Sequence, residues 1–545
     1  MRRKEKKGFW SSESAATAAL YALALPALVA VTGIGFDYAR IASMDSELQN
    51  AADQAALAGA TQLDQTAGSM QRAVDAARGG LVTNSTLFAN DGDGTTVTVP
   101  DTNVYFYETR PDAEADTNRL DRATAANDLK AAFIRVAVAT RTAEYALTPV
   151  VGAFSGDIDA EAVAGIGAAL CRTPPLMICN PNEPSGNTNT ELPFDPDALE
   201  GLGLLAKGGG GSFWAPGNFG YLDTIPGSGG GTPELRQALG WDTPPGECIS
   251  QSANDAVDTE TGNKTDIADS MNTRFDIYNG NTACPTGGVC SASVNSVKDV
   301  THPDPLTGGQ ACKMGNSGWK ESSAPYLPGS NAALPDTTTP ASMGHPRDIC
   351  HATASNTCSG AGPFGDGFWD RDAYFRTHYR RSDGSWWTNA QWQSNTGLAQ
   401  QTGTTRPRFP TRHQVYEWEI ANRGAVIDGV TILGGPSAAF AYGSPVCSAG
   451  AGFGTGTVPS EFVADRRRLS VAVINCVAHG VRGSSKDVPV REFMDVFLVQ
   501  PSLNRVGNRT QKDEIYVEVI GKTKSGSAGE TAGTVIRRDV PYLIR

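Results

Sequence analysis

The stretch AATAALYALALPALVAVTGIGF, residues 15–36, decides the fold of the N-terminal region. It contains no charged residue, and about 20 apolar residues are enough to cross a bilayer as a helix. A helix is expected because a backbone inside lipid must satisfy its own hydrogen bonds. Pro26 lies within the stretch and should bend it locally. The apolar core of a secretory signal has roughly 7–15 residues, so we interpret this longer stretch as a membrane anchor.

The charges around this stretch predict its orientation. A basic cluster precedes it, in which a single acidic residue, Glu5, stands among five basic ones; the basic ones are Arg2, Arg3, Lys4, Lys6 and Lys7. Excess positive charge marks the side of a membrane protein that stays in the cytoplasm. We therefore predict a single-pass protein with residues 1–14 in the cytoplasm and everything from Asp37 onward outside.

The anchor continues without a break into a polar segment, residues 37–59. Apolar side chains recur there at spacings of three and four, which predicts an amphipathic helix with an apolar stripe on one face. Two interpretations are open: a surface helix that packs on its own outer domain, or a stalk that packs on helices of partner subunits. The residues of the stripe are Ile41, Met44, Leu48, Ala52, Ala55 and Ala56.

A short pattern lies at the cytoplasmic edge of the anchor: Gly8, then Phe9, then Glu13 four positions further on. It resembles the cleavage site of type IV prepilins. The resemblance implies removal of residues 1–8, with Phe9 as the new N-terminus and Glu13 as a partner for the new amine. Such pairing matters where charges are buried between packed helices. The alternative is that Glu13 merely lies at the headgroup boundary.

Three segments carry a family resemblance: 23–26 (LALP), 35–40 (GFDYAR) and 48–60 (LQNAADQAALAGA). They resemble the N-terminal region of TadG-like proteins of the bacterial tight-adherence (Flp) pilus assembly system. Residues 216–223 and 468–476 are also similar to segments of longer family members. The resemblance implies an accessory or minor pilin that contacts pilins and other pilus-assembly subunits. It would lie in the inner membrane, with a large periplasmic or extracellular domain. Because the prepilin-like site is better associated with TadE- and TadF-type pseudopilins, the class within the system stays open.

Length and composition set the domain organisation. A chain of 545 residues holds two or three folded units, and 61 Gly with 32 Pro indicate a loop-rich exterior. The net charge of −13 argues against nucleic acid as a partner, because phosphate binding needs a basic surface. We predict an α+β protein with four regions: a leader (1–14), a transmembrane helix (15–36), an amphipathic helix with a small pilin-like sheet (37–170), and a mainly antiparallel, cysteine-containing exterior domain (171–545).

Local patterns predict the elements of these regions. Helices are predicted at 71–78 and 233–239, each followed by glycine. Strands are predicted where β-branched and aromatic residues gather. The predicted strands are 96–99, 104–107, 133–139, 158–164, 414–420, 469–477, 490–499, 515–520 and 535–544.

All ten cysteines lie at or beyond residue 171, in the part predicted to be outside the cell membrane. An even number in an oxidising compartment predicts disulfides, whose connectivity one sequence does not define. Neighbours in sequence make plausible pairs: 171 with 179, 284 with 290, and 350 with 358. A metal site formed by Cys350, His351 and His345 is a rival interpretation, without any familiar zinc-ligand spacing. The cysteines are Cys171, Cys179, Cys248, Cys284, Cys290, Cys312, Cys350, Cys358, Cys447 and Cys476.

The patterns of common enzymes are incomplete in this chain. Gly521-Lys522-Thr523 lacks the upstream glycine of a phosphate-binding loop, and neither HExxH nor GxSxG occurs. Asp91-Gly92-Asp93-Gly94 resembles part of a calcium loop but lacks the other ligands, so a tight turn is expected. We therefore predict no catalytic residue, metal or cofactor.

An aromatic stretch at residues 368–392, with arginines interleaved, has two interpretations. It can fill the core of a loop-rich domain, which we favour. It can also form a face for sugars or protein partners, as in a surface adhesin that binds glycans or matrix. Exposure of Trp386 and Trp387 would favour the adhesin.

Overall fold

A computed structural model gives the fold as two compact units. The first contains the chain up to Ala168 together with the strand from Asp539 onward, and the second contains Ala169–Arg538. The structure describes residues 13–64, 67–79, 86–87, 95–108, 110–152, 154–171, 175–207, 219–223, 232–245, 248–250, 256–260, 267–279, 283–302, 311–353, 358, 364–400, 409–434, 443–448, 452–453, 466–482, 484–505, 510, 512, 514–523 and 536–544.

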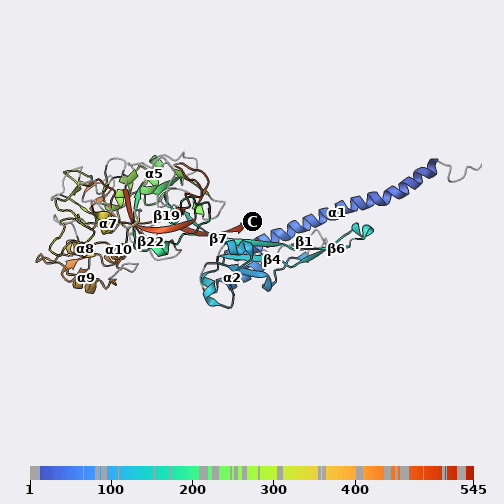
Figure 1. Ribbon diagram of the computed structural model, residues 1–545, viewed down its shortest axis with the longest axis horizontal. Coiled ribbons are helices and arrows are strands. Elements are labelled where there is room, and N and C mark those ends of the chain that lie inside the picture. Colours follow the sequence, from blue (N-terminus) through green and yellow to red (C-terminus); the bar gives the residue numbers. More distant parts are fainter. Residues whose placement is uncertain are drawn as a thin grey trace, which may run out of the picture. The chain divides into compact units, whose positions relative to one another are not determined.

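Helix α1, Glu13–Ala60, is the long helix of the first unit (Figure 1). Its 48 residues run through Pro26 without a break in the helix and make a rod of about 72 Å. From Met44 onward, buried side chains recur every three or four residues, and Met44 and Leu48 are almost wholly shielded from solvent. The second part of α1 therefore forms one wall of this unit's core.

Small side chains let the rest of the core approach α1 closely. Helix α2, Ser69–Arg78, and strand β4, Phe133–Ala137, pack against it. A Cβ atom on Gly59 would lie 2.5 Å from Cδ1 of Ile134 and 3.2 Å from the backbone oxygen of Ala73, so glycine favours this close approach. Alanines dominate the buried face of α1 and continue into α2, in the order Ala51, Ala52, Ala55, Ala56, Ala60, Ala73 and Ala77.

An antiparallel sheet lies against these helices. Strand β4 pairs with β3, Val104–Tyr107, and with β7, Glu161–Cys171, while β23, Ile536–Ile544, also pairs with β7. The last strand of the chain thus returns to the first unit. A hairpin of β5, Arg141–Glu144, and β6, Ser155–Ile158, extends from this region. Short elements complete the unit: β1 Thr86–Leu87, β2 Thr95–Thr96, η3 Asp101–Asn103, α4 Arg110–Ala115, η4 Ala125–Leu129 and η5 Thr148–Val151.

An eight-stranded sheet organises the second unit, in the order β20-β12-β10-β8-β19-β21-β22-β9. All its pairs are antiparallel except β8 with β19. Every residue of β19 is buried, so both faces of the sheet are covered. The strands are β8 Leu176–Cys179, β9 Gly203–Lys207, β10 Phe219–Asp223, β12 Ala256–Glu260, β19 Arg468–Ile474, β20 Val488–Pro489, β21 Glu492–Leu498 and β22 Glu514–Lys522.

Short helices and hairpins make up the rest of the second unit. The end of β7 pairs with β11, so that Cys171 lies opposite Cys248 in the register. The helices are α5 Thr232–Gly240, α6 Ala268–Asn272, α7 Ile349–Ala352, α8 Arg371–His378, α9 Asn389–Thr396 and α10 Arg412–Ala421, with 3-10 turns η6 Pro196–Leu199 and η8 Thr273–Phe275. The short strands are β11 Cys248–Ser250, β13 Val300–Thr301, β14 Lys320–Glu321, β15 Val426–Ile427, β16 Val430–Thr431, β17 Cys447–Ser448 and β18 Gly452–Phe453.

Most of the predicted elements are confirmed, but the strand at 414–420 is wrong, since these residues lie in α10. Thr411 and Gln414 form a capping box that begins the helix, and Val415, Tyr416 and Glu419 are buried at helical spacing. Their β-branched and aromatic character suggested a strand. The predicted strand at 96–99 is only the short β2, and the one at 158–164 is divided between β6 and β7.

A buried ionic contact ties α10 to the sheet. The Arg412 guanidinium bonds to Glu518 of β22 at 2.6 Å and also to Asp348, and all three side chains are fully buried. Glu518 additionally accepts the backbone N–H groups of Arg412 and His413 at the start of α10. A carboxylate at a helix N-terminus faces the positive end of the helix dipole. The charges are therefore compensated inside the fold.

Four disulfides link described cysteines of the second unit. Two are pairs of sequence neighbours, Cys284–Cys290 and Cys350–Cys358, as predicted. The suggested pair of 171 with 179 is wrong, because Cys179 of β8 bonds to Cys476, 297 residues further on. The fourth is Cys312–Cys447. Long-range bridges thus connect the sheet and the irregular segments.

The aromatic stretch is mainly core, as favoured. Trp387 and Trp392 are completely buried, in a cluster that also contains Trp369, Tyr374, Phe375 and Tyr379. Trp386 is the exception, at 36% exposed, and the Arg380 guanidinium lies over its ring. A single exposed ring does not make the extended aromatic face that the adhesin interpretation requires.

Candidate membrane anchor and its junction with the first unit

The first part of α1 exposes its apolar side chains. Among the described residues, α1 is the one helix long and apolar enough to span a membrane. Soluble monomeric proteins rarely expose so large a contiguous apolar surface. The exposed residues, with their exposed fractions, are Leu20 (68%), Tyr21 (74%), Leu23 (80%), Leu25 (61%), Leu28 (64%), Val29 (42%), Val31 (70%), Ile34 (50%) and Phe36 (52%).

Asp37 joins the anchor to the first unit. It follows the last apolar residue, yet its side chain is only 3% exposed. Its carboxylate accepts the backbone N–H groups of Ala146, Leu147 and Thr148 at 2.7–2.9 Å, and the Thr148 hydroxyl as well. Desolvation raises the pKa of Asp37, but these hydrogen bonds together outweigh it and hold the pKa well below its usual range. The ionised carboxylate thus binds the backbone of residues 146–148 to α1 through hydrogen bonds.

A glycine one turn earlier makes this contact possible. A Cβ atom on Gly33 would lie 2.8 Å from Cβ of Leu147, closer than two side chains tolerate. Gly33 and Asp37 are buried on the same face of the helix as Met44 and Leu48. The packed face of α1 therefore begins at Gly33, inside the apolar stretch. Neither role follows from the local sequence pattern, although the GFDYAR segment contains this aspartate.

The apolar stripe of α1 is not free for partners. Met44, Leu48 and the alanines after them are buried against α2 and β4 of the same unit. Of the two interpretations left open by the sequence, packing on the chain's own domain is confirmed. The stalk interpretation is wrong for this face, because its side chains already have partners within the fold.

The predicted cleavage pattern lies largely beyond the described structure. Gly8 and Phe9 are outside the described residues, as are the acidic pair Asp91 and Asp93. Glu13 is the first residue of α1. Processing after Gly8 therefore stays a prediction.

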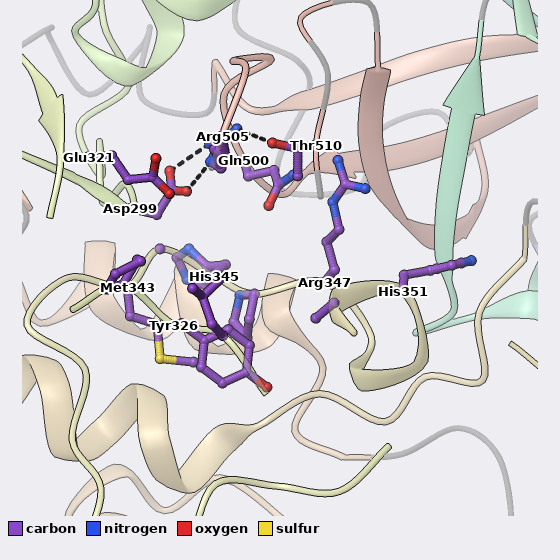
Figure 2. Close-up of a pocket in the computed structure, with 15 residues that line it drawn as sticks. Asp299, Glu321, Tyr326, Met343, His345, Arg347, His351, Gln500, Arg505 and Thr510 are labelled. Atoms are coloured by element: carbon purple, nitrogen blue, oxygen red, sulfur yellow. Dashed lines mark hydrogen bonds and ion pairs between the residues drawn. The ribbon is translucent and has the colours of Figure 1, made fainter. Parts of the chain in front are cut away.

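The second unit contains a small cavity with both charged and apolar side chains in its wall (Figure 2). Arg505 lies at one side, where it pairs with Asp299 and donates to Thr510 at 2.9 Å. Arg347 pairs with buried Glu514 at 3.0 Å, and burial lowers the pKa of His345 and of His351 to about 4. The cavity measures about 50 Å³. Ligand sites usually have about 300–1,000 Å³, so this space suits bound water and not a substrate.

The structure argues against the rival metal interpretation for these cysteines. Cys350, His351 and Cys358 do lie together, with ligand atoms within 4.8 Å of one another. However, the two sulfurs form a disulfide, which leaves neither as a thiolate ligand. His351 Nδ1 is 2.9 Å from the Tyr516 hydroxyl, and His345 lies in the separate cluster around Glu419.

Another hollow, of about 570 Å³, lies beside α8 and the β15–β16 hairpin. Gly434 and Gly443 contribute to its wall and border residues 435–442, which lie outside the described part of the chain. The described residues alone therefore do not define its extent.

A comparison with protein families finds a match in the region of the anchor. The family model described as "Putative Flp pilus-assembly TadE/G-like" matches residues 15–62. The match confirms the resemblance to TadG-like proteins, and it covers nearly all of α1, including Gly33 and Asp37. It links this helix to Flp pilus assembly and supports an N-terminal membrane anchor. No curated protein and no solved structure matches the chain.

Proposed function

We propose that this protein is a membrane-anchored component of Flp pilus assembly, either an accessory protein or a minor pilin, that acts through protein–protein contacts. One observation supports this most directly. The TadE/G-like match covers the helix whose first part exposes an apolar surface and whose second part is built into a folded unit. Such a helix holds a folded body at a membrane surface.

We place the protein in the bacterial inner membrane, with its N-terminus in the cytoplasm. The basic residues before α1 favour this orientation. The four disulfides favour an oxidising compartment for the second unit, which is periplasmic or extracellular in this proposal.

The partner surface is the outward face of α1 just beyond the apolar stretch. The buried stripe is occupied, so contacts with pilins or other assembly subunits need a different face. Tyr38 is 71% exposed, and the positions one and two turns further on are exposed as well, namely Ala42 and then Asp45 and Ser46. This face lies next to the membrane, where subunits anchored by similar helices meet.

Site-specific photocrosslinking tests the proposal. A photoreactive amino acid at Tyr38 should yield adducts with Flp pilins or pilus-assembly membrane proteins. The same probe at Leu129, which is 59% exposed elsewhere on the first unit, is the matched control. Adducts only with unrelated proteins, together with normal pilus formation in cells lacking this chain, would contradict the proposal.

We further propose cleavage after Gly8, on the pattern of Gly8, Phe9 and Glu13. N-terminal sequencing of the membrane-extracted protein should begin at Phe9. A Met1 start in cells with an active prepilin peptidase would show that the pattern is not a cleavage site. That outcome would favour an accessory protein over a minor pilin.

A further inference from the structure

We propose that the tip of the β5–β6 hairpin, of which the structure describes residues 145–152 and 154, inserts into the outer interface of the bilayer as a second membrane contact beside α1. This inference rests on the membrane anchoring proposed above. The tip reads YALTPVVGAF and contains no charged residue. Leu147 and Phe154 are 38% and 67% exposed, so the tip presents apolar surface that the described fold does not cover.

The position of the tip along α1 sets its depth. The apolar stretch of 22 residues, 15–36, makes about 33 Å of helix, close to the hydrocarbon thickness of about 30 Å. Leu147 lies against Gly33, which is three residues, or about 4.5 Å, inside the outer end of that stretch. A bilayer that covers the apolar stretch therefore reaches Leu147 as well.

Much of the backbone of the tip is hydrogen-bonded within the protein. An unsatisfied N–H group is costly in lipid. In this loop, Asp37 accepts the N–H groups of residues 146–148, and Tyr145 and Gly152 donate to the carbonyls of Phe154 and Pro149. The charge of Asp37 is itself surrounded by donors, including the Thr148 hydroxyl. The N–H groups of residues 145–148 and of Gly152 thus have acceptors within the protein, and Pro149 has no N–H group to satisfy.

Charged and aromatic residues mark where insertion ends. Exposed Glu144 closes β5 on one side of the tip, and exposed Asp157 lies on β6 on the other. On the helix, exposed Tyr38 follows the apolar stretch, at the level where aromatic residues gather at membrane surfaces. The contact is therefore shallow and limited to the residues between Tyr145 and Phe154. The lipid interface fits this surface because it is continuous with the apolar surface of α1.

Spin-label accessibility in the full-length protein tests the inference. Nitroxides are attached to the variants L147C, F154C, L25C and L129C, each reconstituted in vesicles of phosphatidylcholine and phosphatidylglycerol. Labelled wild-type chain measures the background from native cysteines. Collision with oxygen reports lipid, and collision with a water-soluble nickel chelate reports solvent. The oxygen-to-nickel ratio should be several-fold higher at positions 147 and 154 than at position 129.

The other outcomes separate the two proposals. Labels at 147 and 154 that resemble 129, with position 25 in lipid, would overturn tip insertion and leave the anchor intact. A label at 25 in water would overturn the anchor as well. A label at 129 in lipid would contradict a contact specific to the tip. Labels at 147 and 154 shielded from both reagents would indicate a protein partner and also overturn the inference.

Discussion

Different interactions stabilise the folds of the two units. The first contains neither cysteine nor histidine, and its core is built around the alanine-rich face of one continuous helix. The second contains all ten cysteines, all six histidines and several fully buried arginines. A long helix positions its own side chains by local geometry, whereas the many irregular segments of the second unit depend on bridges and buried charges between distant residues. The units should therefore respond differently to the same perturbation.

Removal of the disulfide with the longest sequence separation should give the largest difference between the stabilities of the two units. The double change Cys179→Ser and Cys476→Ser should lower the unfolding free energy of the second unit by roughly 4–5 kcal/mol, because it frees a very long loop. The matched change at Cys284 and Cys290, only 6 residues apart, should cost roughly 2 kcal/mol.

Urea unfolding followed by tryptophan fluorescence measures this difference, since all tryptophans except Trp10 lie in the second unit. Hydrogen exchange in the first unit should be unchanged. Equal losses from both double changes would mean that loop length does not govern the second unit's stability.

Leu48→Ala should have the opposite effect, because it should lower the stability of the first unit and leave the stability of the second unchanged. Leu48 is fully buried in the core formed with α2 and β4, so its truncation should cost about 3 kcal/mol. Hydrogen exchange should accelerate in α2 and β4, while the fluorescence transition of the second unit stays in place. Leu129→Ala, at an exposed position, is the control. If Leu48→Ala behaves like Leu129→Ala, the stripe does not hold the unit together.

Acid should destabilise the second unit selectively. Burial lowers the pKa of His302, His345 and His351 from 6.5 to about 4. Between these values the unfolded chain binds protons that the folded chain does not, so stability falls as pH drops from about 6.5 towards 4. Burial also lowers the pKa of His378 and of His479, which adds to this trend. It raises the pKa of Asp276 to about 6 and the pKa of Asp370 above its usual range, which opposes the trend with fewer groups. Urea midpoints at pH 7 and pH 5 should show a loss for the second unit, and an unchanged or higher midpoint at pH 5 would be inconsistent with neutral buried histidines.

Asp37→Asn should give the smallest and most local effect. The amide keeps the shape but loses the charge that three backbone N–H groups and the Thr148 hydroxyl share. Exchange at residues 146–148 should accelerate in the variant, with the rest of the unit unaffected. In the wild-type chain the protection should persist down to about pH 4, because the folded pKa lies well below 3.8. Loss of protection already at pH 6 would contradict an ionised Asp37.

Local sequence patterns predicted much of this fold because helices and strands depend on neighbouring residues. The charge-free stretch, the stripe at Met44 and Leu48, and strands β19 and β21 follow from composition and period alone. The strand predicted at 414–420 failed because the capping box of Thr411 and Gln414 outweighs β-branched composition.

Contacts between distant residues could not be predicted from such patterns. Cys476 is 297 residues from Cys179, and the N–H groups that Asp37 accepts lie 109–111 residues away. The return of β23 to the first unit has the same long-range origin. The junction at Gly33 and Asp37 therefore becomes visible only in the folded chain, although the TadE/G-like match includes both residues.

Alkaline extraction of membranes from cells that express the full chain tests the central claim, that the exposed part of α1 lies in the bilayer. The wild-type protein should stay in the membrane pellet. A double change of Leu23→Arg and Leu28→Arg, at two of the most exposed apolar positions, should release it to the soluble fraction, because charges at the bilayer centre are costly. Release of the wild-type protein under the same conditions would contradict the account.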